Sequence, residues 1–274
     1  MIERMLKMKS YGARVGVVVA LLAMLGLGAC SQSPSSPSGK DEAGSGTQSS
    51  EVAQSEEGAT SQVQPGAYFE ALASNDPVIM AQAVELAVPG SDAEAYAVYL
   101  TATAQAEVDS GYTKEPRQVK EIWSGFAMCG DSDGQGESCS EYTHVEYQGD
   151  LIENFDAGGS PLTGRISLGD GEFRSMGDGG EIAFVAAYHS IAGDVVAVFE
   201  LISHRYALWP TATYVSPGNR QHIADSGIGP RALNREESAT YAFYFKDAKF
   251  GGDVTVSATD GNGWELESVT FATQ

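Results

Sequence analysis

Histidine is the side chain best suited to proton transfer near neutral pH, and this chain of 274 residues has four. They lie far apart in the sequence, at His144, His189, His204 and His222. None has a second histidine or a cysteine at the spacing of metal ligands, and the motifs His-Glu-X-X-His and Ser-X-X-Lys are absent. Catalytic groups also assemble from distant residues, so these patterns lower the expectation of an enzyme without excluding one. We predict no catalytic residue, no metal and no cofactor.

Tyr142 and His144 are two residues apart in a segment with strand character. Alternate residues of a strand point to the same face of a sheet. Two interpretations remain open: the pair lines a pocket, or it belongs to a half-buried sheet surface.

Aromatic rings form a further candidate surface, because flat rings stack on sugar faces. Trp123 and Trp264 lie in strand patterns and are predicted to be core residues. Trp209 precedes a proline and is predicted to lie exposed in a loop. The segment from Tyr214 to Ile228 is rich in turn residues, so Trp209 and Tyr214 are candidate binding residues.

The segment Asp131-Ser-Asp-Gly-Gln-Gly-Glu137 has carboxylates at alternate positions followed by glycine, an arrangement that can wrap a calcium ion. An EF-hand loop needs a glutamate at its twelfth position, where this sequence has Tyr142. A solvated turn is the favoured interpretation.

The amino terminus is basic and then strongly apolar. The apolar run from Val15 to Ala29 is roughly 15 residues long, shorter than the roughly 20 that span a membrane, and predicts a signal peptide over residues 1–29. The run ends in Leu27-Gly-Ala-Cys30, which resembles the lipobox of bacterial lipoproteins. The resemblance implies cleavage after Ala29 and a lipid on the sulfur of Cys30. The alternative is an ordinary secretory signal followed by a chance cysteine.

With Cys30 assigned to lipid, Cys129 and Cys139 remain as an even pair in an oxidising compartment. The polar turn between them can return one strand beside another, so a disulfide that closes a hairpin is predicted. Closing a loop of about eleven residues is worth roughly 2.5 to 3 kcal/mol in the chain-entropy model. Redox-active pairs usually have the tighter Cys-X-X-Cys spacing, which favours a structural role.

The mature chain is strongly acidic. The whole sequence has 16 basic and 37 acidic residues; removing the four basic and one acidic residue of the signal peptide leaves 12 and 36, a net charge of −24. Such a surface is repelled by phosphate backbones and anionic lipids. Nucleic acid is therefore an unexpected partner, and attachment to the membrane is expected through the lipid alone.

Residues 30–66 are rich in serine, glycine and glutamine and poor in apolar side chains, which predicts a disordered tether. Two domains are predicted after it. Residues 67–175 open with helical signals over 67–73, 78–87 and 92–109, and strand patterns follow over 119–128, 142–148, 151–155 and 165–168. Helices packed on an antiparallel sheet form an α+β module.

Residues 176–274 are predicted to contain only strands. About seven patterns separated by turn residues favour an immunoglobulin-like β-sandwich. The predicted strands span 182–188, 195–204, 212–215, 220–223, 239–246, 254–258 and 264–271.

Three segments carry a resemblance to secreted lipoproteins of high-GC Gram-positive bacteria: Tyr68 to Pro77, Leu151 to Leu162, and Thr213 to Gly218. Those proteins pair a helix-plus-sheet module, similar to the cone-shaped nuclear transport factor 2-like fold, with an immunoglobulin-like module. The resemblance implies this architecture and no activity.

Together these patterns predict a lipid-anchored protein of the cell envelope, on the outer face of the cytoplasmic membrane. Its expected function is non-catalytic binding or scaffolding of an unknown protein or glycan partner. The alternative is a ligand-binding or hydrolytic cone-shaped domain, with the sandwich as a spacer.

Overall fold

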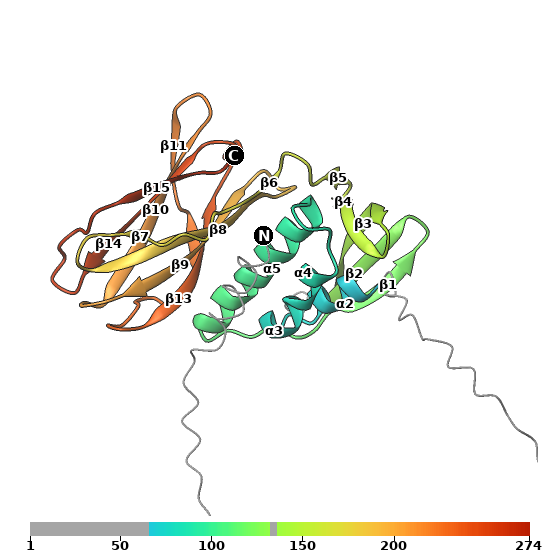
Figure 1. Cartoon of the computed structure of the whole chain (residues 1–274), viewed down its shortest axis with the longest axis horizontal. Coiled ribbons are helices and arrows are strands. Elements are labelled where there is room, and N and C mark those ends of the chain that lie inside the picture. Colours follow the sequence, from blue (N-terminus) through green and yellow to red (C-terminus); the bar gives the residue numbers. More distant parts are fainter. Residues whose placement is uncertain (1–65, 132–135) are drawn as a thin grey trace, which may run out of the picture. The chain divides into compact units, whose positions relative to one another are not determined.

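A computed structural model describes residues 66–131 and 136–274. Helices and strands carry the labels of Figure 1. The predicted signal peptide, Cys30 and nearly all of the predicted tether lie outside the described residues. Among the described helices, none is long and apolar enough to cross a membrane.

Four helices lie among the described residues, and two of them begin at the capping residues that the sequence predicts, Asp76 and Ser91. The four helices are α2 (Ala67–Ala73), α3 (Pro77–Met80), α4 (Gln82–Glu85) and α5 (Asp92–Asp109). The side chain of Asp76 accepts a hydrogen bond from the backbone nitrogen of Val78 at 2.9 Å, and Ser91 accepts one from Glu94 at 3.1 Å. Both contacts satisfy backbone donors that a helix leaves free in its first turn. The helix predicted over 78–87 is instead two short helices, α3 and α4.

A five-stranded antiparallel sheet follows the helices in sequence. Its strands, in sequence and in spatial order, are β1 (Gln118–Ile122), β2 (Gly125–Asp131), β3 (Glu137–Gln148), β4 (Leu151–Ala157) and β5 (Ser160–Pro161). The prediction of one strand over 119–128 is wrong, because the chain reverses at Trp123 and Ser124. Gly125 permits the reversal: its φ is +149°, and a side chain there would meet the carbonyl oxygen of Tyr142.

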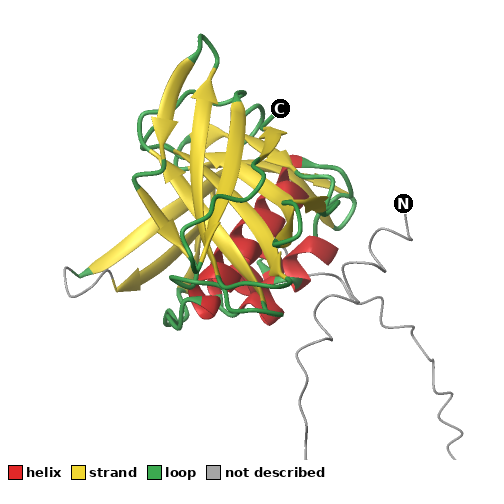
Figure 2. Ribbon diagram, turned by 90° about the vertical axis from the view of Figure 1, so that its left-hand side faces the viewer, coloured by secondary structure: helices red, strands yellow, loops and turns green. Residues whose placement is uncertain are grey.

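Two further antiparallel sheets face each other across a common core, and strands make up a larger share of the described chain than helices do (Figure 2). The six-stranded sheet has the order β12-β13-β9-β8-β6, with β7 also paired to β8. Its strands are β6 (Ile166–Leu168), β7 (Arg174–Ser175), β8 (Gly180–His189), β9 (Val195–Ser203), β12 (Ser226–Ile228) and β13 (Ser238–Phe245). The four-stranded sheet has the order β11 (Arg220–Ile223), β10 (Leu208–Ser216), β14 (Asp253–Asp260) and β15 (Val269–Ala272).

The six-stranded sheet is covered on both faces, which explains the continuous apolar runs of its strands. On β9, Val195, Ala197 and Phe199 face the four-stranded sheet. The alternate residues Val196 and Val198 pack into the core that contains the helices. The ring of Phe199 lies 5.5 Å from that of Phe271, which belongs to the opposite sheet.

The helices and the six-stranded sheet share one core. The helix α5 contacts β8 and β13, and β6 pairs with β8 although it precedes residue 175 in the sequence. The described residues belong to one compact unit. The division into two domains at residue 175 stays a prediction.

One polar contact joins the end of α5 to β13 and gives a testable pH effect. The carboxylate of Asp109 accepts a hydrogen bond from the backbone nitrogen of Thr240 at 2.7 Å, and Thr240 lies opposite Glu200 in the sheet. Burial, and secondly the charge of Asp109, raise the pKa of the Glu200 carboxyl. The folded chain therefore binds this proton more tightly than the unfolded chain does.

We expect Glu200→Gln to stabilise the protein at pH 7. A raised carboxyl pKa contributes stability that is fully present below the unfolded pKa, and this contribution is lost as the pH rises through the folded pKa. Glutamine resembles the protonated carboxyl, so it should remove the loss at pH 7 and change little at pH 4. Urea unfolding at both pH values measures this, with the exposed Glu267→Gln as control. A variant less stable than the natural chain at pH 7 would overturn the assignment.

Candidate functional site

A hollow of about 350 Å³ lies at the end of the five-stranded sheet where β1 turns into β2. Its lining residues come from β1, β3 and the turn: Ile122, Trp123, Ser124, Glu141, Thr143 and His144. Tyr142, between two of them on β3, is buried against the helices. Because neighbouring side chains of a strand point to opposite faces, Glu141 and Thr143 lie on the face away from the helices.

Trp123 is the most exposed large apolar side chain among the described residues. It is 99% exposed, so the prediction that it lies in a core is wrong. The reason is the reversal of the chain, which places Trp123 at the tip of a hairpin rather than inside a strand. The backbone nitrogen of His144 donates a hydrogen bond to the carbonyl of Ser124 at 3.2 Å and fixes the turn against β3.

His144 contributes an imidazole to the same hollow. Its Nδ1 lies 2.9 Å from Oδ2 of Asp156, and its backbone has a φ of +50°, which is uncommon for a residue with a side chain. The register of β3 against β4 shifts between Thr143 and Glu146, which marks a bulge at this point.

The prediction that Tyr142 and His144 share a sheet face is wrong, because the bulge turns the two side chains in different directions. His144 has a side chain that is 78% exposed, whereas Tyr142 is buried with its ring 5.3 Å from that of Phe69. Burial raises the pKa of the Tyr142 hydroxyl. Tyr142 is therefore a core residue, and only His144 is available to a ligand.

The predicted disulfide between Cys129 and Cys139 is confirmed, and it joins β2 to β3, the strand that supplies three residues of the hollow. The residues are directly opposite in the register of β2 and β3, with their α-carbons 4.0 Å apart. This is shorter than the 4.4 to 6.8 Å usual for disulfides, and near the spacing of the closer type of directly opposed pair in antiparallel sheets. The bond limits separation of β2 from β3.

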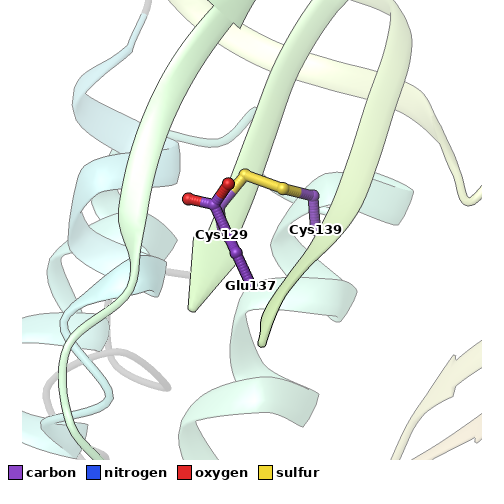
Figure 3. Close-up of side chains that lie close together, drawn as sticks. All are labelled: Cys129, Glu137 and Cys139. Atoms are coloured by element: carbon purple, nitrogen blue, oxygen red, sulfur yellow. A yellow bond between two sulfur atoms is a disulfide. The ribbon is translucent and has the colours of Figure 1, made fainter. Parts of the chain in front are cut away.

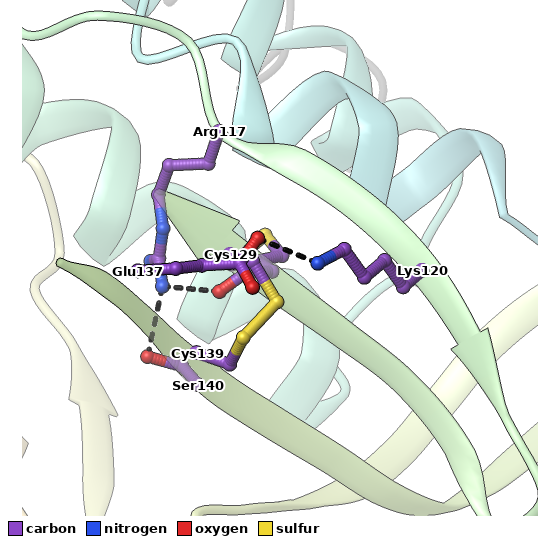
Figure 4. The surroundings of a disulfide bond; sticks show 7 residues. Arg117, Lys120, Cys129, Glu137, Cys139 and Ser140 are labelled. Carbon is purple, nitrogen blue, oxygen red and sulfur yellow. Dashed lines mark hydrogen bonds and ion pairs between the residues drawn. A yellow bond between two sulfur atoms is a disulfide. The ribbon is translucent and has the colours of Figure 1, made fainter. Parts of the chain in front are cut away.

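Charged side chains surround the disulfide. The carboxylate of Glu137 lies close to the sulfur atoms (Figure 3), and it forms an ion pair of 2.6 Å with Lys120. Arg117 donates hydrogen bonds to Met128 and Ser140 on the two strands (Figure 4). Both sulfur atoms belong to the disulfide, so neither can bind a metal as a thiolate.

The sheet that carries the hollow is strongly acidic. Between Gln118 and Pro161 the sequence has one basic residue, Lys120, besides His144. The same stretch has nine acidic residues: Glu121, Asp131, Asp133, Glu137, Glu141, Glu146, Asp150, Glu153 and Asp156. A second, smaller hollow of about 260 Å³ is also acidic, with Asp92, Glu146 and Glu153 in its lining.

The remaining predicted binding residues lie elsewhere. Tyr214 is completely buried, so its prediction as an exposed binding residue is wrong. It alternates inward along β10, and its hydroxyl donates to the carbonyl of Lys249 at 2.9 Å and accepts from the nitrogen of Gly252 at 2.8 Å. Trp209 lies in β10 rather than in a loop and is 36% exposed. Trp264, predicted to be core, is 74% exposed because it lies before β15 begins.

Two catalytic patterns escaped the sequence analysis. Ser216 Oγ lies 2.7 Å from Nε2 of His222, whose Nδ1 lies 3.2 Å from the carbonyl oxygen of Lys246. Such a series of nucleophile, base and orienting acceptor occurs in hydrolases. Both side chains are buried, and neither hollow on the five-stranded sheet includes them.

The second pattern is Gly130-Asp-Ser-Asp-Gly134, which has the Gly-X-Ser-X-Gly spacing of a nucleophile elbow. That elbow joins a strand to a helix, whereas here the flanking segments are the antiparallel strands β2 and β3. Residues 132–135, which include most of the calcium-like segment, lie outside the described residues.

Comparisons with known proteins found little. No family model matches the chain, and no curated protein matches it. Among solved structures, the chain is similar to the archaellum periplasmic stator protein FlaG from Sulfolobus acidocaldarius, with 14% identity and a TM-score of 0.21. The match covers 31% of this chain and 92% of that one. A likeness this distant carries no argument about function.

Proposed function

We propose that this chain is a lipid-anchored, extracytoplasmic binding module that holds a protein or cell-wall polymer through the hollow beside Trp123. The anchor is the lipid on Cys30, and the module stands on the outer face of the cytoplasmic membrane. Residues 67–175 form an α+β module, and residues 176–274 form an immunoglobulin-like sandwich. The role is binding or scaffolding, without catalysis.

The observation that carries the proposal is the complete exposure of Trp123 on a supported turn. A tryptophan side chain buries about 150 to 250 Å² when covered, and tryptophan is among the residues that contribute most to binding at interfaces. Here the ring lies beside Glu141 and His144, which supply polar partners in the same hollow. An apolar platform with a few fixed polar groups is the usual composition of a binding site.

The experiment compares two exposed tryptophans. Trp123→Ala should reduce the yield of partner captured by in-cell crosslinking at least 10-fold, since a central tryptophan is typically worth about 2 kcal/mol or more. Trp264→Ala, which removes an exposed ring outside the hollow, should leave capture unchanged. Neither change should lower the melting temperature, because both side chains are exposed. Undiminished capture by Trp123→Ala would refute the proposal.

A hydrolytic function is the second candidate, and the contact between Ser216 and His222 is the observation that favours it. A fluorophosphonate probe forms a bond to the oxygen of an activated serine, with loss of fluoride and transfer of the serine proton to the base. Labelling of the natural chain that Ser216→Ala abolishes would establish this alternative. We expect no labelling, because both residues are buried.

A further inference from the structure

We propose that the hollow beside Trp123 recognises a positively charged protein segment, with a lysine or arginine side chain over the tryptophan ring. This inference rests on the proposed function and names the chemistry of its partner. The surface involved, here called the Trp123 face, consists of Ile122, Trp123, Glu141, Thr143 and His144, with Asp156 behind the histidine.

The sheet that carries the Trp123 face is strongly acidic. The stretch that forms the five-stranded sheet has nine acidic residues and one lysine, and that lysine is already paired with Glu137. The chain therefore offers no free ammonium group of its own within this sheet. The negative electrostatic potential of such a sheet attracts cationic partners and repels anionic ones. A wall polymer that carries phosphate or carboxylate groups is therefore disfavoured as the partner.

The exposed ring of Trp123 is suited to bind a cation. Cations bind best over the face of tryptophan, with a contribution of about 0.5 to 2 kcal/mol that grows as water is excluded. The chain uses this interaction elsewhere: Arg174 lies 4.4 Å from the ring centre of Phe271, and Arg165 lies 5.2 Å from that of Tyr188. The ring of Trp123 is 99% exposed, so it is free to accept a cation from another molecule.

Glu141 lines the same hollow as the ring of Trp123. A lysine or arginine over Trp123 can reach the Glu141 carboxylate and form a charge-assisted hydrogen bond, roughly twice as strong as a neutral one. His144, which lines the same hollow, is held by Asp156. The aliphatic part of a lysine or arginine side chain can cover Ile122 while its charged end remains hydrated.

Binding of defined probes to the full mature chain tests the inference. The probes are a fluorescent nine-residue peptide of alternating lysine and serine, the same peptide with glutamate in place of lysine, and a neutral N-acetylglucosamine tetramer. The variants are Trp123→Ala and Glu141→Gln, with Trp264→Ala and Glu267→Gln as matched controls at exposed positions outside the hollow.

We expect the lysine peptide to bind, with affinity about 10-fold weaker for Trp123→Ala and about 3- to 10-fold weaker for Glu141→Gln. The two control variants should bind as the natural chain does. Equal losses in all four variants would indicate general attraction to an acidic protein and overturn the inference. Binding of the neutral tetramer that depends on Trp123, without such dependence for the peptide, would overturn the inference and leave the proposed function standing. The proposed function fails separately, when Trp123→Ala leaves in-cell capture intact.

Discussion

Replacing Phe69 by alanine should lower the free energy of unfolding by about 3 to 5 kcal/mol, the range typical of buried phenylalanines. The side chain on α2 is fully buried. Its ring stacks at 4.7 Å on that of Phe126 in β2 and lies 5.5 Å from that of Phe155 in β4. A cavity at this point would separate the helices from the sheet that carries the hollow.

Urea unfolding of Phe69→Ala measures the loss, and Val78→Ala on the next helix is the control. Val78 is 78% exposed, so its truncation should change stability by no more than about 0.5 kcal/mol. A loss below about 1 kcal/mol for Phe69→Ala would mean that α2 does not share a core with β2 and β4. Phe126 directly follows the turn, so this substitution should also weaken capture at Trp123.

The largest expected change in location follows from Cys30→Ala. Only the thiolate of a cysteine takes the lipid as a thioether, and each buried CH₂ of an acyl chain contributes about 0.8 kcal/mol to membrane binding. We therefore expect the variant to lose all incorporation of labelled palmitate and to leave the membrane fraction.

The matched control is Cys129→Ser together with Cys139→Ser, which removes the other two cysteines of the chain. This variant should retain the palmitate label while losing roughly 2.5 to 3 kcal/mol of stability, because the hairpin is no longer closed. Label retained by Cys30→Ala would show that the anchor lies elsewhere.

Local sequence signals predicted the elements that depend on neighbours in the chain. The capping residues Asp76 and Ser91 marked true helix starts, and the strand predicted over 220–223 is β11 as observed. The strand predicted over 195–204 is β9, with bounds Val195–Ser203. These elements depend on hydrogen bonds and burial of residues a few positions apart, so the order of residue types in the sequence predicts them.

The candidate site could not be predicted, because it depends on departures from regular periodicity. Trp123 lies in a segment with strand character, so burial was the natural expectation; only Gly125 signals the turn that exposes it. His144 lies on a different face from Tyr142 because of a β-bulge, and no residue type in the sequence indicates this bulge. Tyr214 has turn residues after it, yet its hydroxyl finds buried partners on distant parts of the chain.

A photo-crosslinking amino acid at position 143, in the lining of the hollow beside Trp123, tests the binding account most directly in the anchored protein of living cells. Position 264, an exposed site outside the hollow, is the reference site. We predict a specific crosslinked partner from position 143, with little or none from position 264, and a weaker product when Glu141 is changed to lysine. A partner captured from position 264 and not from position 143 would contradict the account.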